Sequence, residues 1–199
     1  MVWMGIVLVL SIGFAVLRGG KLSNLAEIYI TAWWLLFVGL AIQVAAGFVP
    51  ADRTYSEELA VGLILGSYLP LLLVAWINRT RSGMWLVGLG ILMNFVVIAV
   101  NQGMPVLPEA ITLAGGTADL AADPKHVVLD TSTLLPFLAD IIPIPQNVIS
   151  MGDVVLGVGI GVFLDDQLTQ PLRYFRHRID AEAGSAAPQL RKIDGGAGR

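Results

Sequence analysis

The sequence predicts an all-α fold: a polytopic integral membrane helix bundle with five transmembrane spans and a re-entrant or interfacial outer segment. Three observations favour this fold class. Of the 199 residues, 56% are hydrophobic and only 14% are charged, which is far from the balance of a soluble domain. Five apolar runs of about 17–22 residues approach the length that a helix needs to cross the hydrocarbon core. The basic residues between these runs gather on one side of the predicted membrane.

The predicted spans lie near residues 1–17, 28–49, 59–77, 84–100 and 148–164. With an outer segment, residues 101–147, they form a transmembrane bundle domain over residues 1–165. No basic stretch precedes the first apolar run, and the first charged residue, Arg18, comes only after it. We therefore expect a retained span and not a cleaved signal. Residues 166–199 are rich in glycine, alanine and single charges, which predicts a largely disordered cytoplasmic tail.

The basic residues of the loops orient the predicted spans. One side carries Arg18, Lys21, Arg79, Arg81, Arg173, Arg176 and Arg178. The other side holds Arg53 and Lys125 among many acidic residues. By the positive-inside rule the first side is cytoplasmic. We therefore expect a multi-pass protein of a cytoplasmic (inner) membrane, with its N-terminus outside and its C-terminus inside.

Small residues recur at helical spacing within two of the predicted spans. Gly62 and Gly66 lie four residues apart in the third span, and Gly157 and Gly161 lie four residues apart in the fifth. This spacing lets membrane helices approach each other closely, so we expect these glycines to serve helix packing.

The outer segment contains an apolar stretch that is too interrupted to be a lipid-exposed span. Irregular backbone at membrane depth survives only where protein or water satisfies its polar groups, so this stretch should lie on the bundle or dip back into it. We expect Pro136 to split it into two short helices. Its polar residues would share one stripe of a helix, and this stripe either lines a pocket or faces water. They are His126, Asp130, Thr133 and Asp140.

Two polar residues inside the predicted spans are costly in lipid, Asn94 and Asp153. Counted inward from the outer segment, both lie about 10 Å below the outer boundary, so we expect them to form a hydrogen bond. Asn101 shares a helix face with Asn94 and continues a polar track toward the outer corner at residues 101–105. Asp153 is the leading candidate for a functional carboxylate, and the other interpretation is a hydrogen-bonded helix clasp.

Composition excludes several classes of function. The net charge is −3 and the basic residues are scattered, which disfavours a nucleic-acid partner. The chain has no cysteine, so it has neither disulfides nor thiolate chemistry. A single outer-side histidine among carboxylates is a weak signal for a metal site. We expect neither a metal nor a cofactor.

Four motifs carry a resemblance to a known family. They are Asn94-x-x-Val97-Ile98-x-x-Asn101-x-Gly103-Met104-Pro105, His126-x-x-x-Asp130-x-x-Thr133, Leu138-x-Asp140-x-x-Pro143 and Ser150-x-Gly152-Asp153-Val154. As a set, over residues 1–165, the chain resembles the small bacterial polytopic membrane proteins grouped as domain of unknown function (DUF) 5317. The resemblance implies a membrane architecture and supports the outer-face candidates, but it implies no activity. The candidate binding residues are Asn94, Asn101, Gly103, Met104, Pro105, His126, Asp130, Thr133, Asp140 and Asp153.

A thinner likeness concerns the segment from Asn147 to Asp153, which resembles the Asn-x-x-Asp motif of lipoprotein signal peptidases. That resemblance implies an intramembrane aspartyl hydrolase with two carboxylates near the outer surface. The spacing differs, because six residues separate Asn147 from Asp153, and the companion Gly-Asn-x-x-Asp-Arg motif is absent. Asp130 or Asp140 would have to supply the second carboxylate, because the chemistry needs one protonated and one ionised group.

Two classes of function therefore stay open. The favoured hypothesis is a binding or accessory protein whose outer polar pocket takes a lipid or small-molecule ligand, or supports a membrane protein partner. The alternative is the aspartyl hydrolase, with Asp153, Asp130 and Asp140 as the candidate catalytic residues. A transporter acting alone is disfavoured because five spans do not divide into equal repeats.

Overall fold

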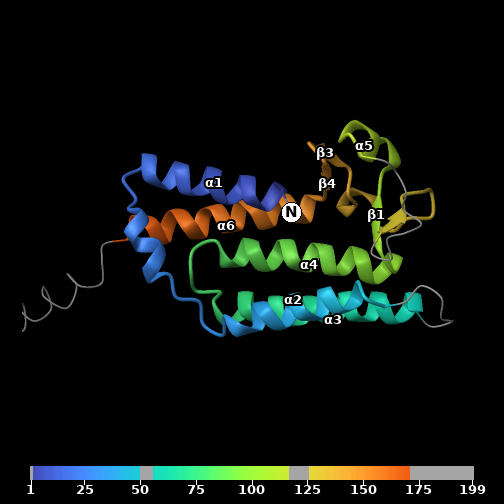
Figure 1. Ribbon diagram of the computed structural model, residues 1–199, viewed down its shortest axis with the longest axis horizontal. Coiled ribbons are helices and arrows are strands. Elements are labelled where there is room, and N and C mark those ends of the chain that lie inside the picture. The colour runs from blue at the N-terminus through green and yellow to red at the C-terminus, as the bar shows by residue number, and fades with distance from the viewer. Residues whose placement is uncertain (1, 50–55, 117–125, 171–199) are drawn as a thin grey trace, which may run out of the picture.

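The computed structural model describes residues 2–49, 56–116 and 126–170, and these residues are mostly helical (Figure 1). The longer helices are α1 (Val2–Leu17), α2 (Trp34–Ala46), α3 (Ser56–Ile77), α4 (Met84–Asn101) and α6 (Met151–Thr169). The short helical elements are η1 (Leu22–Glu27), α5 (Pro108–Leu113) and η3 (Pro136–Leu138). The strands are β1 (Met104–Val106), β2 (His126–Val128), β3 (Ile142–Ile144) and β4 (Asn147–Ile149).

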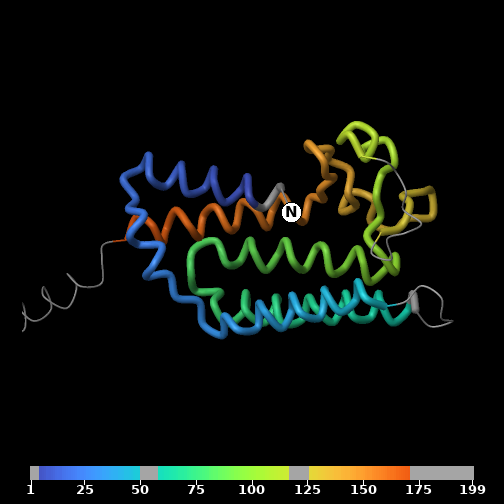
Figure 2. The backbone as a smooth tube through the Cα atoms, viewed as in Figure 1, coloured from blue at the N-terminus to red at the C-terminus, as the bar shows by residue number. Residues whose placement is uncertain are grey.

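The longer helices lie side by side in the order α1, α6, α4, α3, α2. Figure 2 shows the course of the chain: α1, α3 and α6 run toward the end of the bundle that carries η1, whereas α2 and α4 run the opposite way. At that opposite end, residues 104–116 and 126–149 form a small irregular layer that we call the cap. The helix directions thus alternate along the chain.

Two described helices are long and apolar enough to cross a membrane, judged by length and composition alone. They cover Glu58–Ile77, with a mean hydropathy of 2.1, and Met84–Asn101, with 2.0. Gly5–Leu17 and Trp34–Ala46 are apolar but shorter. Large apolar side chains project outward along these helices, such as Leu10, which is 67% exposed, and Phe37, which is 61% exposed. Such surfaces are unusual for a soluble monomer.

The core joins the cap to the bundle. Its main cluster of buried side chains combines residues of α3 and α4, such as Tyr68 and Ile98, with Met104 of β1 and Leu138 of η3. A smaller cluster near the other end is built from Met84 of α4 and from Phe163 and Leu164 of α6. The cap is therefore packed onto the helix ends and is not a separate unit.

Two small sheets in the cap correct the all-α prediction. Strands β1 and β2 pair in parallel, with Met104 opposite His126, and β3 and β4 form an antiparallel pair. The two short helices expected over residues 126–145 are replaced by strands and by the single 3-10 turn η3, so that prediction is wrong. Prolines 136, 143 and 145 have no N–H for a helix ladder. The backbone of Asp140 instead bonds to β1, where its N–H donates to Pro105 O at 2.8 Å.

The boundaries of two helices also differ from the sequence prediction. Residues 28–33 form no α-helix, and α2 begins only at Trp34. Helix α6 begins at Met151 because residues 147–149 pair in β4, and it continues to Thr169. The first residues assigned to the tail, 166–169, are therefore helical. The remaining part of the predicted disordered tail lies outside the described residues.

Candidate functional site

The centre of the candidate site is a hydrogen-bonded cluster between α4 and the start of α6, which we call the clasp: Asn94, Ser150 and Asp153. The Asn94 amide Nδ2 donates to Asp153 Oδ1 at 2.8 Å, which confirms the hydrogen bond expected from matching depth. The Ser150 hydroxyl donates to Asn94 Oδ1 at 2.9 Å. Ser150 is fully buried and Asn94 is 7% exposed. The clasp thus ties two helices together through polar groups shielded from solvent.

The same cluster opens helix α6. Ser150 is the N-cap residue, and its hydroxyl accepts from the Asp153 backbone N–H at 3.0 Å. In return the Ser150 N–H donates to Asp153 Oδ2 at 3.2 Å. This reciprocal pair is a capping box, which satisfies two backbone donors at a helix start. Asp153 therefore lies in the first turn of α6, and not deep inside the helix as a count from residue 148 places it.

Every polar atom of the clasp side chains has a partner. Both carboxylate oxygens of Asp153 accept a hydrogen bond, one from Asn94 and one from the Ser150 backbone. The sequence analysis did not single out Ser150, although Ser-x-x-Asp before an apolar run is the signal of a capping box. The geometry fits a structural clasp, because both carboxylate oxygens of Asp153 already accept hydrogen bonds from the protein.

Glycine makes the clasp possible, because α4 and α6 come very close at this level. A Cβ placed on Gly152 would overlap Asn94 Oδ1, and one on Gly90 would lie 2.5 Å from Gly152 O. In contrast, nothing lies within 4 Å of a Cβ placed on Gly62 or Gly66. A Cβ placed on Gly161 would lie 3.1 Å from Ser11 Oγ of α1. The expected close approach therefore occurs at Gly161 but not at Gly62 or Gly66, and it is tighter at Gly90 and Gly152.

The outer corner at the end of α4 is largely structural. The Asn101 side chain holds the backbone of Leu134, donating to Leu134 O at 2.9 Å and accepting from its N–H at 2.8 Å. Gly103 donates its N–H to Ile98 O at 3.2 Å and so closes the helix end. Met104 is 4% exposed, and Pro105 is among the fully buried side chains. These candidate residues position the cap on the bundle.

Asp130 and Thr133 form an exposed turn. The Asp130 carboxylate accepts from the hydroxyl and the N–H of Ser132, at 2.6 and 2.8 Å, and the Thr133 hydroxyl accepts from the Asp130 N–H at 2.9 Å. Hydrogen bonds from Ser132, and secondarily from Thr133, lower the pKa of Asp130. Asp130 is thus engaged within its own turn, and among the described residues no hydrogen bond joins this turn to Asp153.

His126 and Asp140 meet at a pocket in the cap. His126 Nε2 lies 3.8 Å from Asp140 Oδ2, and Asp140 is only 7% exposed. The pocket has a volume of about 160 Å³, and the amide side chains of Gln146 and Asn147 line it together with apolar residues. Tyr68 of α3 is 9% exposed and belongs to the same core cluster as Leu138 of the cap. Sequence reasoning missed Tyr68 and Gln146.

The described residues contain no group of three or more histidine, aspartate or glutamate side chains placed to hold a metal ion. The cap pocket combines one imidazole, one buried carboxylate and two amides. Such a set can accept and donate several hydrogen bonds to a small polar group. Binding is therefore the chemistry that this arrangement supports most directly.

These features define a mostly helical protein in which a bundle of apolar helices carries a small cap. A family described as "Family of unknown function (DUF5317)" matches residues 27–164, and the chain belongs to this family. The match confirms the resemblance and leaves α1 outside the matched range. No curated protein and no solved structure matches the chain.

Proposed function

We propose that the protein spans the cytoplasmic membrane of a bacterium with five helices, with its N-terminus and cap outside and its C-terminus inside. The alternating directions of α1, α2, α3, α4 and α6 support this topology. The apolar side chains that face outward along these helices support it as well. A further support is that Arg18, Arg79 and Arg81 lie at the end of the bundle away from the cap. The helices with no more than about 17 apolar residues require local thinning of the bilayer or tilt of their neighbours.

Single cysteines test the topology cleanly because the natural chain has none. We would introduce Thr112→Cys in the cap and Thr169→Cys at the end of α6, two exposed positions. A membrane-impermeant maleimide should label the first on intact cells and the second only after permeabilisation. Labelling of both positions on intact cells would contradict the five-span topology.

We propose further that the protein is a binding or accessory protein whose cap pocket takes a small polar ligand, either a lipid head group or a free solute. The His126–Asp140 pair carries this proposal. The Asp140 carboxylate is 7% exposed and lies in the wall of the pocket beside His126. An imidazole 3.8 Å away and two amides give the pocket both donors and acceptors.

Complementation tests the pocket without knowledge of the ligand. The readout is the growth or envelope phenotype of a deletion strain, with protein abundance measured in parallel. Asp140→Asn and His126→Gln preserve side-chain size and should fail to complement at normal abundance. Asp130→Asn is the matched control, because it removes a carboxylate from an exposed turn of the same cap. Full complementation by both pocket variants would refute the binding proposal.

The aspartyl-hydrolase alternative needs Asp153 together with Asp130 or Asp140. Two observations weigh against it: Asp153 uses both oxygens in the clasp, and Asp130 uses its carboxylate within its own turn. The paired exchange Asn94→Asp with Asp153→Asn moves the carboxylate from α6 to α4 while keeping the clasp. Complementation by this double variant would eliminate Asp153 as a catalytic acid or base. Loss of complementation at normal abundance would favour the alternative.

A further inference from the structure

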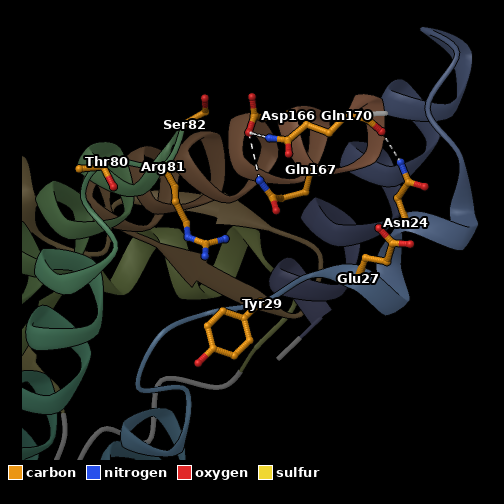
Figure 3. A pocket seen from close by; sticks show the side chains of 9 residues that line it. All are labelled: Asn24, Glu27, Tyr29, Thr80, Arg81, Ser82, Asp166, Gln167 and Gln170. Atoms are coloured by element: carbon orange, nitrogen blue, oxygen red, sulfur yellow. Dashed lines mark hydrogen bonds between the residues drawn. The ribbon is translucent and has the colours of Figure 1, made fainter. Parts of the chain in front are cut away.

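A second pocket lies at the end of the bundle away from the cap, and Figure 3 shows it from close by. Its volume is about 450 Å³, and all nine side chains that line it are polar. They come from three regions: η1 with the following linker, the α3–α4 connection, and the last turn of α6. The sequence analysis proposed a binding role for none of them and used only Arg81, to orient the predicted spans. A polar lining of this kind suits a charged head group or solute and not an acyl chain.

Buried amides hold the three walls of this pocket in place. The Asn24 amide Nδ2 donates to Leu168 O at 2.9 Å and to Gln170 O at 2.8 Å, so η1 caps the end of α6. Asn78, which is 2% exposed, accepts from the Thr31 N–H at 3.0 Å and donates to Thr31 O at 2.9 Å. This bond pair fixes the linker that carries Tyr29 against the end of α3. The pocket is therefore preorganised.

The charges in the pocket are separated. Arg81 of the α3–α4 connection supplies the single cation of the lining, and Glu27 and Asp166 supply two carboxylates. In Figure 3 the guanidinium of Arg81 extends toward the middle of the labelled side chains. Within the described residues this guanidinium makes no hydrogen bond and no ion pair. Asp166 Oδ2 accepts from the side-chain amides of Gln167 and Gln170, at 3.0 and 2.8 Å.

We infer that this pocket binds a zwitterion with a phosphate and a primary ammonium, the chemistry of the phosphatidylethanolamine head group. The planar guanidinium of Arg81 suits two phosphate oxygens. The carboxylates of Glu27 and Asp166 suit the ammonium, which donates up to three hydrogen bonds. A quaternary ammonium cannot donate hydrogen bonds, so the site should discriminate against choline.

The position of the pocket agrees with a lipid head group. It lies where α3 ends at Ile77, α4 begins at Met84 and α6 ends at Thr169. In a bundle that spans the bilayer, helix ends coincide with the head-group layer. In the proposed orientation this is the cytoplasmic leaflet. The inference rests on the proposed membrane insertion, but it is independent of any ligand in the cap.

Two variants isolate the ligand chemistry in the full-length protein. Arg81→Gln removes the free cation of the pocket. Arg79→Gln is the matched control, because Arg79 belongs to the same connection but stacks 4.6 Å over the ring of Trp76 and donates to Trp76 O at 3.0 Å. Glu27→Gln removes the exposed carboxylate that should meet the ammonium, and no bond of the described residues is lost with it.

Native mass spectrometry of detergent-purified protein measures binding of added dioleoyl phosphatidylethanolamine and dioleoyl phosphatidylcholine. We expect at least tenfold tighter binding of the ethanolamine lipid. Arg81→Gln should weaken it at least tenfold and Glu27→Gln should reduce the preference over choline, whereas Arg79→Gln should match the natural protein. O-phosphoethanolamine without acyl chains distinguishes the source: competition at equal concentration identifies a free zwitterion, and its failure to compete identifies the lipid.

Equal binding of the two lipids by the natural protein would overturn the inference, and so would unchanged ethanolamine-lipid binding in Arg81→Gln. The comparison between lipids uses the natural protein, so it stands even if a variant folds poorly. Failure of membrane insertion in the cysteine-labelling experiment would instead refute the topology. The two failures are thus distinguishable.

Discussion

Exchanging the polar groups of the clasp tests whether Asn94, Ser150 and Asp153 act as one hydrogen-bonded unit. Asn94→Asp replaces the Nδ2 donor, 2.8 Å from Asp153 Oδ1, with a second carboxylate oxygen. Asp153→Asn makes the opposite change on α6. The double variant carries both changes. It therefore still has one asparagine and one aspartate at these two positions, as the natural protein does. We expect the first single variant to be strongly destabilised and the double variant to recover.

The magnitude follows from the geometry. Asn94→Asp loses a hydrogen bond to a charged acceptor, worth about 1.5–3 kcal/mol. Two unit charges 2.8 Å apart repel by about 6 kcal/mol at an effective dielectric constant of about 20. Separation of the groups or uptake of a proton relieves part of this repulsion, so we expect a net loss of about 3–6 kcal/mol in the free energy of unfolding. For a chain of this size that corresponds to a fall in Tm of roughly 10–20 °C.

The single variant Asp153→Asn should cost less. The Asn94 amide can turn so that its oxygen accepts from the new amide, and its Nδ2 then donates to the Ser150 hydroxyl oxygen. In the natural protein the Ser150 O–H donates to Asn94 Oδ1, and in the variant it loses this acceptor. A buried donor without a partner costs about 1–3 kcal/mol. Asp153→Asn alone is therefore not silent for stability, which is why the double exchange is the cleaner test of function.

The double variant should lie within about 1 kcal/mol of the natural protein, because each hydrogen bond of the clasp keeps one donor and one acceptor. The new carboxylate at position 94 accepts from the Ser150 hydroxyl and from the new amide at position 153. The oxygen of that amide accepts from the Ser150 N–H. Far-UV circular dichroism during thermal unfolding in a mild detergent measures all four proteins. A double variant no more stable than Asn94→Asp alone would refute the reasoning.

Three further predictions concern packing, the cap and pH. Gly152→Ala should lower the free energy of unfolding by about 1–3 kcal/mol, because the added Cβ overlaps Asn94 Oδ1. Gly62→Ala is the control, because nothing lies within 4 Å of its added Cβ. Equal Tm values of the two variants in detergent would contradict this packing. Asn101→Ala should release the Leu134 segment and raise its hydrogen exchange, with little change in α3; unaltered exchange there would exclude the proposed clamp. The lowered pKa of Asp130 means that its ionised form stabilises the turn. That stabilisation is present above the unfolded-state pKa and is lost as pH falls through the lowered folded-state value. The protection factor of the Ser132 amide, which corrects the exchange rate for the intrinsic effect of pH, should therefore fall at low pH in the natural protein but not in Asp130→Ala.

The sequence determined the helical elements and one polar contact well. Runs of apolar residues predicted helices near the observed α1, α3 and α4, because a continuous apolar run is a local property. Equal depth from the outer boundary predicted that Asn94 and Asp153 would bond, and they do. The count behind that prediction was inaccurate, because α6 begins at Met151 and Asp153 therefore lies in its first turn.

The prediction for the cap was wrong because the structure of the cap depends on partners that are distant in the chain. His126 and Thr133 were assigned to a helical stripe, yet β1 supplies the backbone partners that turn residues 126–128 into a strand. Asp130 and Asp140 share that stripe in sequence spacing, but one lies in an exposed turn and the other beside His126. Spacing along the chain predicts a common face only where the backbone is helical.

By itself, the sequence determined that this protein is built mainly of apolar helices and that its costly polar residues need partners, because both follow from residue type and local spacing. The tertiary structure decided which partners they have. It added Ser150 to the clasp, where its hydroxyl donates to Asn94 Oδ1, and it gathered the Arg81 pocket from three separate helix ends. Close packing at Gly152, and not glycine spacing alone, selects the helix pair that approaches. Contacts of this range depend on how whole helices pack, which no local pattern encodes.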